Sequence, residues 1–173
     1  MNKQTLPAFN SSFLLKHDLG NGDLCIAHGF GALDLKFDFD VWLPSRNMNL
    51  QRPLVWTVEQ KRNLIESVLV RRAIPPISVI FTTEDVYQVI DGKQRTSAFI
   101  SYLRNEFDFC GYFCDELPKD YLGQIKRHWI ATYRLCEYSD RLVTDDEKIE
   151  WFRWINFSGT PQDSLHLQEL EKN

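Results

Sequence analysis

The stretch VIDGKQRTSAF, residues 89–99, joins a run of apolar β-formers to a segment with helical apolar spacing through an Asp-Gly turn. A glycine in such a turn lets the backbone come close to a ligand, because no Cβ stands in the way. Lys93 and Arg95 follow at once, where a new helix would present unpaired N–H groups and about half a positive charge. The stretch therefore predicts a strand, a turn and a helix N-terminus that suits an anion.

The local sequence leaves two interpretations of this turn open. Lys93 and Arg95 suit a polyphosphate better than a single carboxylate, since arginine can donate two parallel bonds and lysine acts as a point charge. Asp91 would repel a phosphate unless it caps the helix or holds a magnesium ion or a ribose hydroxyl. The alternative is an ordinary β-turn-α connection whose cations are solvated.

The segments around this turn predict one α/β domain. Capping-box spacing at Thr57/Gln60 and Thr144/Glu147 marks two helix starts, and alternating or β-rich runs mark the strands. The predicted helices cover 58–71, 93–104, 118–127 and 145–156. The predicted strands cover 33–43, 77–81, 86–90 and 129–138, with a hairpin within 13–28 and a loop over 156–161.

The amino-acid composition rules out a positive electrostatic potential over the whole protein. The 173 residues carry 20 Lys+Arg against 24 Asp+Glu, a net charge of −4, so any contact with DNA requires a local basic patch. The stretch 46–72 holds six cations and is the candidate, its alternative being a solvated helix face. No signal peptide or apolar run long enough for a membrane span is present. Four cysteines without C-x-x-C spacing favour reduced thiols in a cytoplasm.

An ordered series of motifs brings a family into view: QRPLVW (51–56), IPPI (74–77), VIDGKQR (89–95), DELP (115–118) and INFSGTP (155–161). Over roughly residues 47–165 the chain resembles the N-terminal domain of GmrSD-type restriction endonucleases, which is related to the ParB/sulfiredoxin fold. The resemblance implies a small mixed sheet with flanking helices. Residues 1–46, with their own predicted β-hairpin and first strand, lie outside the resemblance, and we expect this extension to pack as one domain with a ParB-like domain at 47–173.

In that family the motif is usually Asp-Gly-Gln-Gln-Arg and forms a centre that binds and hydrolyses nucleotides. The resemblance implies catalytic roles for Asp91, Gln94 and Arg95, with Asp91 also binding a metal. The nucleotide would be bound by Gln51, Arg52, Gly92, Lys93, Arg95, Thr96 and Asn156. Lys93 replaces the commoner glutamine, and Ser158 replaces a glycine of the family's later loop.

The resemblance implies that the chain is a nucleotide-binding domain and a slow NTPase that uses a nucleoside triphosphate with Mg²⁺. It would act as a sensor or regulator in DNA restriction, phage defence or counter-defence. Because 173 residues leave no room for the HNH domain of family members that cut DNA, we expect the chain not to cleave DNA alone, and a separate nuclease is a candidate partner. Two alternatives stay open. One is a DNA- or protein-binding module with a decayed nucleotide site, and the weaker one is a ParB-like nuclease or nickase.

Overall fold

The computed structural model describes residues 3, 5, 24–25 and 36–157 of the chain. The contacts divide the chain into two units, each made of three segments. The first unit comprises Met1–Leu35, Leu54–Ile77 and Gly92–Tyr133, and the second comprises Lys36–Pro53, Ser78–Asp91 and Arg134–Asn173. The predicted hairpin within 13–28 lies outside the described residues, apart from Leu24–Cys25. The expected domain boundaries at 1–46 and 47–173 stay a prediction.

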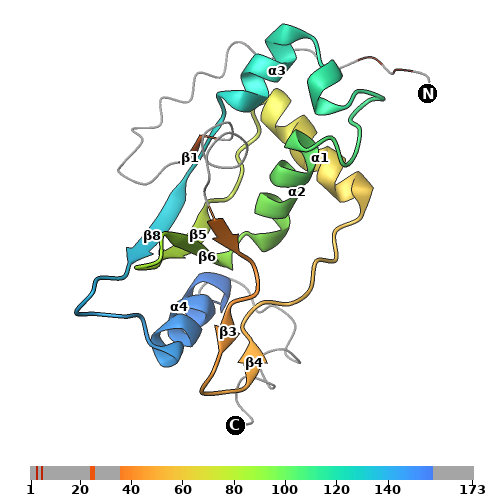
Figure 1. Cartoon of the computed structure of the whole chain (residues 1–173). Helices are drawn as coiled ribbons and strands as arrows, with labels where there is room; N and C mark the ends of the chain where they lie inside the picture. The colour runs from red at the N-terminus through yellow and green to blue at the C-terminus, as the bar shows by residue number, and fades with distance from the viewer. Residues whose placement is uncertain (1–2, 4, 6–23, 26–35, 158–173) are drawn as a thin grey trace. The chain divides into compact units, whose positions relative to one another are not determined.

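The first unit is built around α1 (Val58–Leu69), which packs against α2 (Lys93–Leu103) and α3 (Lys119–Lys126) (Figure 1). The predicted capping box is confirmed, because the Thr57 side chain accepts from the Gln60 N–H and the Gln60 side chain accepts from the Thr57 N–H. The helix buries Leu64, Ile65, Val68 and Leu69, whose i, i+1, i+4, i+5 spacing places them on one face.

The second unit holds most of a four-stranded mixed sheet of order β2-β6-β5-β8. The predicted hairpin is confirmed as β5 (Ile77–Phe81) and β6 (Val86–Asp91), which pair antiparallel. β2 (Lys36–Asp38) runs parallel to β6 on the other side, and β8 (Thr132–Cys136) is the outer strand beside β5. A mixed α/β fold with a small mixed sheet is therefore confirmed.

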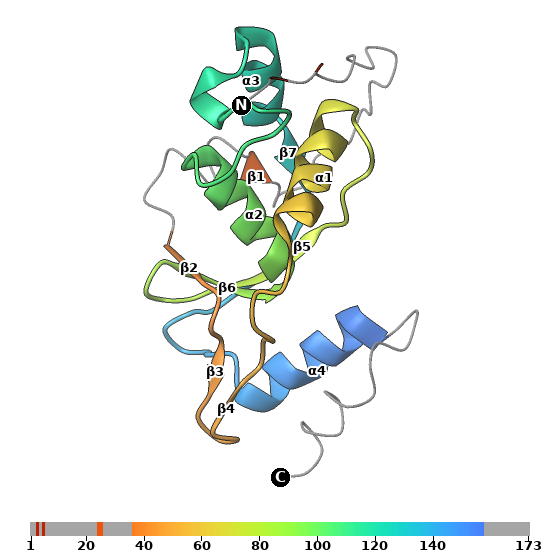
Figure 2. The same cartoon turned by 90° about the vertical axis from the view of Figure 1, so that its right-hand side faces the viewer.

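The core of the second unit forms where α4 (Asp145–Phe157) contacts β6 and the small antiparallel hairpin of β3 (Trp42–Leu43) and β4 (Met48–Asn49) (Figure 2). The Thr144/Glu147 capping box at the start of α4 is confirmed, since each side chain accepts from the other residue's N–H. The buried cluster comprises Val41, Leu43, Leu50, Ile80, Ile90, Ile149 and Phe152.

The remaining described elements belong to the first unit. β1 (Leu24–Cys25) pairs antiparallel with β7 (Trp129–Ile130), and a single 3-10 turn, η2 (Cys114–Glu116), precedes α3. Among the described residues, no helix has the length and apolar character that crossing a bilayer would require.

Two strand predictions are wrong in their extent. The expected strand over 33–43 is broken after β2, because the Asp38 carboxylate accepts from the Asp40 N–H at 2.9 Å and turns the chain. The alternation itself persists, with Val41 and Leu43 fully buried. The expected strand over 129–138 is divided at Ala131, because β7 pairs with β1 whereas β8 lies in the four-stranded sheet.

A tight turn follows α2 at Phe109–Tyr112. Phe109 and Tyr112 exchange both backbone hydrogen bonds, at 2.8 and 2.9 Å, and the two central residues have positive φ, 53° for Cys110 and 80° for Gly111. Positive φ at both central residues defines a type I′ turn, which favours Asn-Gly.

Cys110→Asn should therefore raise the free energy of unfolding by roughly 0.5–1 kcal/mol, because asparagine tolerates the left-handed conformation better than cysteine does. Urea denaturation of both proteins measures the difference. Cys136→Asn, at a cysteine for which no positive φ is found, should give no such gain. Loss of stability in Cys110→Asn would show that the half-buried thiol contributes more through packing than it costs in backbone strain.

Candidate functional site

The Asp-Gly turn lies directly after an irregularity in β6. Ser78 of β5 is opposite Asp91, but its neighbour Val79 is opposite Val89, so Ile90 is an extra residue on β6. Such β-bulges bend a strand and redirect the side chains that follow, and they are common beside functional sites. The bulge therefore sets the direction of Asp91, the last residue of the strand.

Gly92 is the N-cap residue of α2 and has φ +95°. A Cβ at this position would lie 2.5 Å from Cγ2 and 3.0 Å from Cβ of Ile77, a fully buried residue. Both the backbone conformation and the packing thus require glycine. The sequence predicted this turn from Asp-Gly alone, whereas the contact with Ile77 of the IPPI motif emerges only from the structure.

The N-terminus of α2 differs from those of α1 and α4. Gly92 provides no side-chain cap, and the first turn of α2 contains no acidic residue. α1 and α4 each have a capping box and at least one carboxylate in the first turn. The N–H groups at the start of α2 therefore keep their positive potential without a carboxylate of their own first turn to offset it.

Polar side chains of the first turns of α2 are buried. Lys93 is 6% exposed and Thr96 is fully buried, and the Thr96 hydroxyl oxygen has no hydrogen-bond partner among the described residues. Burial of a polar atom without a partner is costly, which makes such an atom a candidate ligand contact. The interpretation in which both cations are solvated is wrong for Lys93.

Arg95 has a structural contact as well as a place in the motif. Its guanidinium is half-buried and donates from Nη2 to the Pro76 carbonyl at 3.0 Å. The same atom lies 3.3 Å from where a Cβ on Gly92 would be. Arg95 therefore ties the first turn of α2 to the IPPI segment, a contact that the sequence did not indicate.

The side chain of Gln94 is hydrogen-bonded to backbone. Its side-chain oxygen accepts from the N–H groups of Val55 and Trp56, at 3.1 and 3.2 Å. These two residues precede the N-cap of α1, so Gln94 links α2 to the segment that leads into α1.

In the second unit, Gln51 also binds backbone. Its side-chain Nε2 donates to the carbonyls of Val89 and Ile90, at 2.7 and 2.5 Å. Arg52, the next residue, is exposed, whereas Asp91 at the end of β6 is half-buried. Gln51 is thus fixed to the strand that carries the motif, and the nucleotide-binding role of Gln51 and Arg52 stays a prediction.

Asn156 corrects the predicted loop over 156–161. α4 continues through Phe157, and the Asn156 amide donates to the Phe152 carbonyl one turn earlier at 2.8 Å. This bond within the helix explains why an asparagine did not end it. Residues 158–161 lie outside the described part of the chain.

Three of the six cations of the basic stretch 46–72 have a carboxylate partner within their own unit. In the second unit Arg46 pairs with Asp146. In the first unit Arg62 pairs with Asp108, Arg72 pairs with Glu66, and the Lys61 ammonium lies 5.7 Å from the centroid of the Phe107 ring. The three carboxylates reduce the positive field on which DNA binding through this stretch would depend, whereas the Phe107 ring leaves the charge of Lys61 in place.

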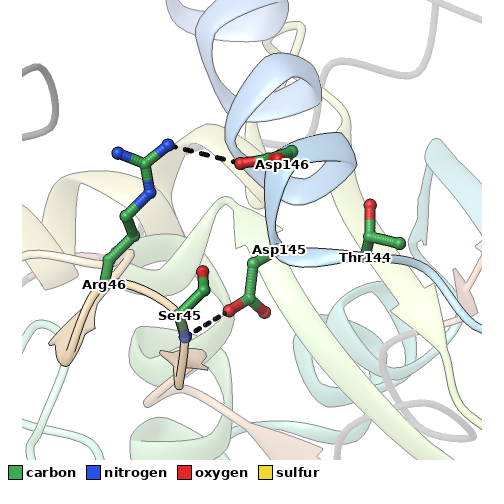
Figure 3. A pocket seen from close by; sticks show the side chains of 5 residues that line it. All are labelled: Ser45, Arg46, Thr144, Asp145 and Asp146. Carbon is green, nitrogen blue, oxygen red and sulfur yellow. Dashed lines mark hydrogen bonds and ion pairs between the residues drawn. The ribbon is translucent and has the colours of Figure 1, made fainter. Parts of the chain in front are cut away.

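A surface pocket lies at the start of α4, lined by Ser45, Arg46, Thr144, Asp145 and Asp146 (Figure 3). Its carboxylates have partners: Asp145 accepts from the Ser45 N–H at 2.9 Å, and Asp146 pairs with Arg46 at 3.3 Å. The pocket contains no residue of the motif, and its contacts join α4 to the β3–β4 turn. Within the described residues, no group of three or more His, Cys, Asp or Glu side chains forms a metal cluster.

The chain thus has a mixed α/β fold in which the motif spans the end of a strand, a glycine turn and the start of an uncapped helix. Residues 46–169 match the family described as GmrSD restriction endonuclease, N-terminal domain, and the chain belongs to that family. Membership implies a role in restriction or phage defence. No curated protein and no solved structure matches the chain.

Proposed function

We propose that the chain binds a nucleoside triphosphate through the N-terminus of α2, and that binding regulates a restriction system. The observation that supports this most strongly is the uncapped start of α2 beside the buried Lys93 and the partnerless hydroxyl of Thr96. An anion there would accept a hydrogen bond from the Thr96 hydroxyl, which has no partner among the described residues, and would meet a favourable helix dipole. The match to the GmrSD N-terminal family agrees with this assignment.

Five residues at the Asp-Gly turn and the start of α2 have distinct parts in this proposal. Gly92 provides close approach to the backbone, Lys93 and Arg95 supply positive charge, and Thr96 donates a hydroxyl hydrogen. Asp91, directly before Gly92, is the proposed magnesium ligand, since Mg²⁺ is commonly held by one or two carboxylates together with substrate phosphates.

Two further groups extend the proposal. Arg52 is the exposed cation that follows Gln51 in the second unit, where Asp91 also lies, and it would add a further positive charge. Asn156 remains a proposed contact, although its amide already donates within α4.

Hydrolysis, if it accompanies binding, would be slow and electrostatic in origin. Magnesium would neutralise phosphate charge when bound, and the charged groups of the motif would orient the phosphates and stabilise the charge that develops on them. The proposed regulatory output passes to a separate nuclease partner. The small mixed sheet, whose strand β6 leads into the motif, supports a fold of the ParB/sulfiredoxin type.

The test is a melting-temperature measurement with ATP, GTP, CTP and UTP, each with magnesium, on the natural protein and on Lys93→Gln, Arg95→Ala and Arg104→Ala. A ligand at one hundred times its Kd stabilises by about 2.7 kcal/mol, which amounts to several degrees. We expect a rise with at least one nucleotide. Arg95→Ala should remove the rise, and Lys93→Gln should reduce it while leaving it measurable.

The controls separate binding from folding. Arg104 is an exposed arginine at the C-cap of the same helix, so Arg104→Ala should keep the full nucleotide-dependent rise. Each rise is measured against the variant's own nucleotide-free value, because Arg95→Ala also loses its bond to Pro76. If no nucleotide raises the melting temperature of the natural protein, the proposal fails and a DNA- or protein-binding module replaces it.

A further inference from the structure

The hydrogen-bonded pairing between β6 and β2 stops before the Asp-Gly turn. β2 pairs with β6 from Lys36 opposite Val86 to Asp38 opposite Gln88, and there β2 ends. Beyond this point the bulge at Ile90 interrupts the pairing with β5 on the other side. Backbone groups in the last part of β6 therefore need partners other than neighbouring strands.

Gln51 supplies such a partner. Its amide group has two hydrogens, and Nε2 lies within hydrogen-bond distance of two successive carbonyls, those of Val89 and Ile90. The bonds span the bulge and reach the residue directly before Asp91. Because both donors of the amide are used on backbone, Gln51 has no side-chain N–H left to donate to a nucleotide.

In the first unit, the Gln94 side chain binds backbone N–H groups in the same way that Gln51 binds carbonyls. Its oxygen accepts from two successive N–H groups, those of Val55 and Trp56, which lie just before the Thr57 N-cap of α1. A carbonyl oxygen has two lone pairs, so these bonds use its acceptor capacity. Gln94 thus fixes the approach to α1 from the second position of α2, one residue after Lys93 and one before Arg95.

We propose that Gln51 and Gln94 are positioning residues, each of which holds backbone within its own unit and does not contact the nucleotide. Gln51 fixes the strand end that presents Asp91, and Gln94 fixes the Leu54–Trp56 segment against the helix that presents Lys93 and Arg95. This assignment rests on the proposed function for the identity of the ligand. The resemblance implied a catalytic role for Gln94 and a nucleotide-binding role for Gln51, and this assignment replaces both.

The experiment uses Gln51→Met and Gln94→Met, which keep side-chain length and remove the amide. Gln124→Met is the matched control, because the Gln124 amide also donates to a backbone carbonyl, that of Leu69, at 2.9 Å, outside the motif. Hydrogen exchange of the free proteins is followed by NMR. Affinity for ATP, GTP, CTP and UTP with magnesium is then measured well below every variant's melting temperature.

For the free proteins we expect faster exchange of the Val55 and Trp56 amides in Gln94→Met and of the Asp91 and Gly92 amides in Gln51→Met. Affinity for the bound nucleotide should fall at least tenfold in both variants and by less than twofold in Gln124→Met. Weakened binding with unchanged exchange would mean direct contact with the nucleotide and would overturn the assignment, as would altered exchange without weakened binding.

The two proposals fail in different ways. If the natural protein binds none of the four nucleotides, the proposed function fails. The exchange of the free proteins then decides alone whether the two glutamines hold the backbone. Unchanged exchange in both variants would contradict the positioning role whatever the protein binds.

Discussion

Gly92→Ala should lower the free energy of unfolding by roughly 2–5 kcal/mol. The first contribution is the left-handed backbone, with φ +95°, which costs a residue with a Cβ roughly 1–2 kcal/mol. The second is the overlap with Ile77, whose Cγ2 would lie 2.5 Å from the new methyl group, and overpacking of this kind costs roughly 1–3 kcal/mol. Ile77 cannot move away easily because it is fully buried at the start of β5.

Gly123→Ala is the control for this measurement. Gly123 lies inside α3, and its new Cβ would meet only the guanidinium of Arg127, at 3.1 Å, which is the flexible end of a long side chain. A helical Gly→Ala change at such a site is expected to be neutral or to stabilise by about 0.5–1 kcal/mol. Urea denaturation of both variants gives the comparison. Equal effects at the two positions would refute the strain at Gly92.

Asp108→Asn should lower the free energy of unfolding by about 1–3 kcal/mol at pH 7. The Asp108 carboxylate is nearly buried, pairs with Arg62 at 2.5 Å and accepts from the Gly111 N–H at 3.1 Å. Removing the charge leaves the Arg62 guanidinium without its closest anion, and charge-assisted bonds contribute about 1.5–3 kcal/mol. The arginine is about a third exposed, which keeps the expected loss below that of a fully buried pair.

The same pair gives a pH dependence of defined sign. Burial on its own would raise the pKa of Asp108, but the hydrogen bonds from Arg62 and Gly111 and the attraction of the guanidinium lower the pKa below its ordinary value. The carboxylate therefore contributes its stabilisation fully above the unfolded pKa of about 3.9, and the contribution is lost as the pH falls through the folded pKa. The difference between Asp108→Asn and the natural protein should shrink in that acidic range.

Glu66→Gln is the comparison for Asp108→Asn. Glu66 pairs with Arg72, and both side chains are at least a third exposed, so its loss should change stability by less than about 1 kcal/mol. Unfolding is measured in guanidinium chloride from pH 7 to pH 2.5. A difference for Asp108→Asn that stays constant over this range would show that the contribution is packing and not charge.

The helices could be predicted from sequence because their signals are local. Thr57 with Gln60 and Thr144 with Glu147 each form a capping box across three residues. The strands were harder because pairing partners are distant in sequence. β2 ends where the Asp38 side chain turns the chain, and β8 begins where the chain changes sheet, and neither event leaves a periodic signal.

The site could be predicted in its residues but not in their contacts. Asp-Gly followed by a helical pattern was enough to place the turn and the helix start. The sequence did not indicate that Arg95 donates to Pro76, that Gln94 accepts from Val55 and Trp56, or that Lys93 is buried. These contacts depend on segments about 20 to 40 residues away, which no local pattern records.

The interleaving of the two units has a consequence for cloning and for inheritance. The chain passes from one unit to the other after Leu35, Pro53, Ile77, Asp91 and Tyr133, so neither unit is a continuous piece of the gene. A chain that begins or ends at any residue from 54 to 132 lacks residues of both units, so the cut isolates neither. One passage falls within the motif, between Asp91 and Gly92. A single crossover cannot exchange one unit while keeping the other, and we expect the two to be transmitted as a single genetic module.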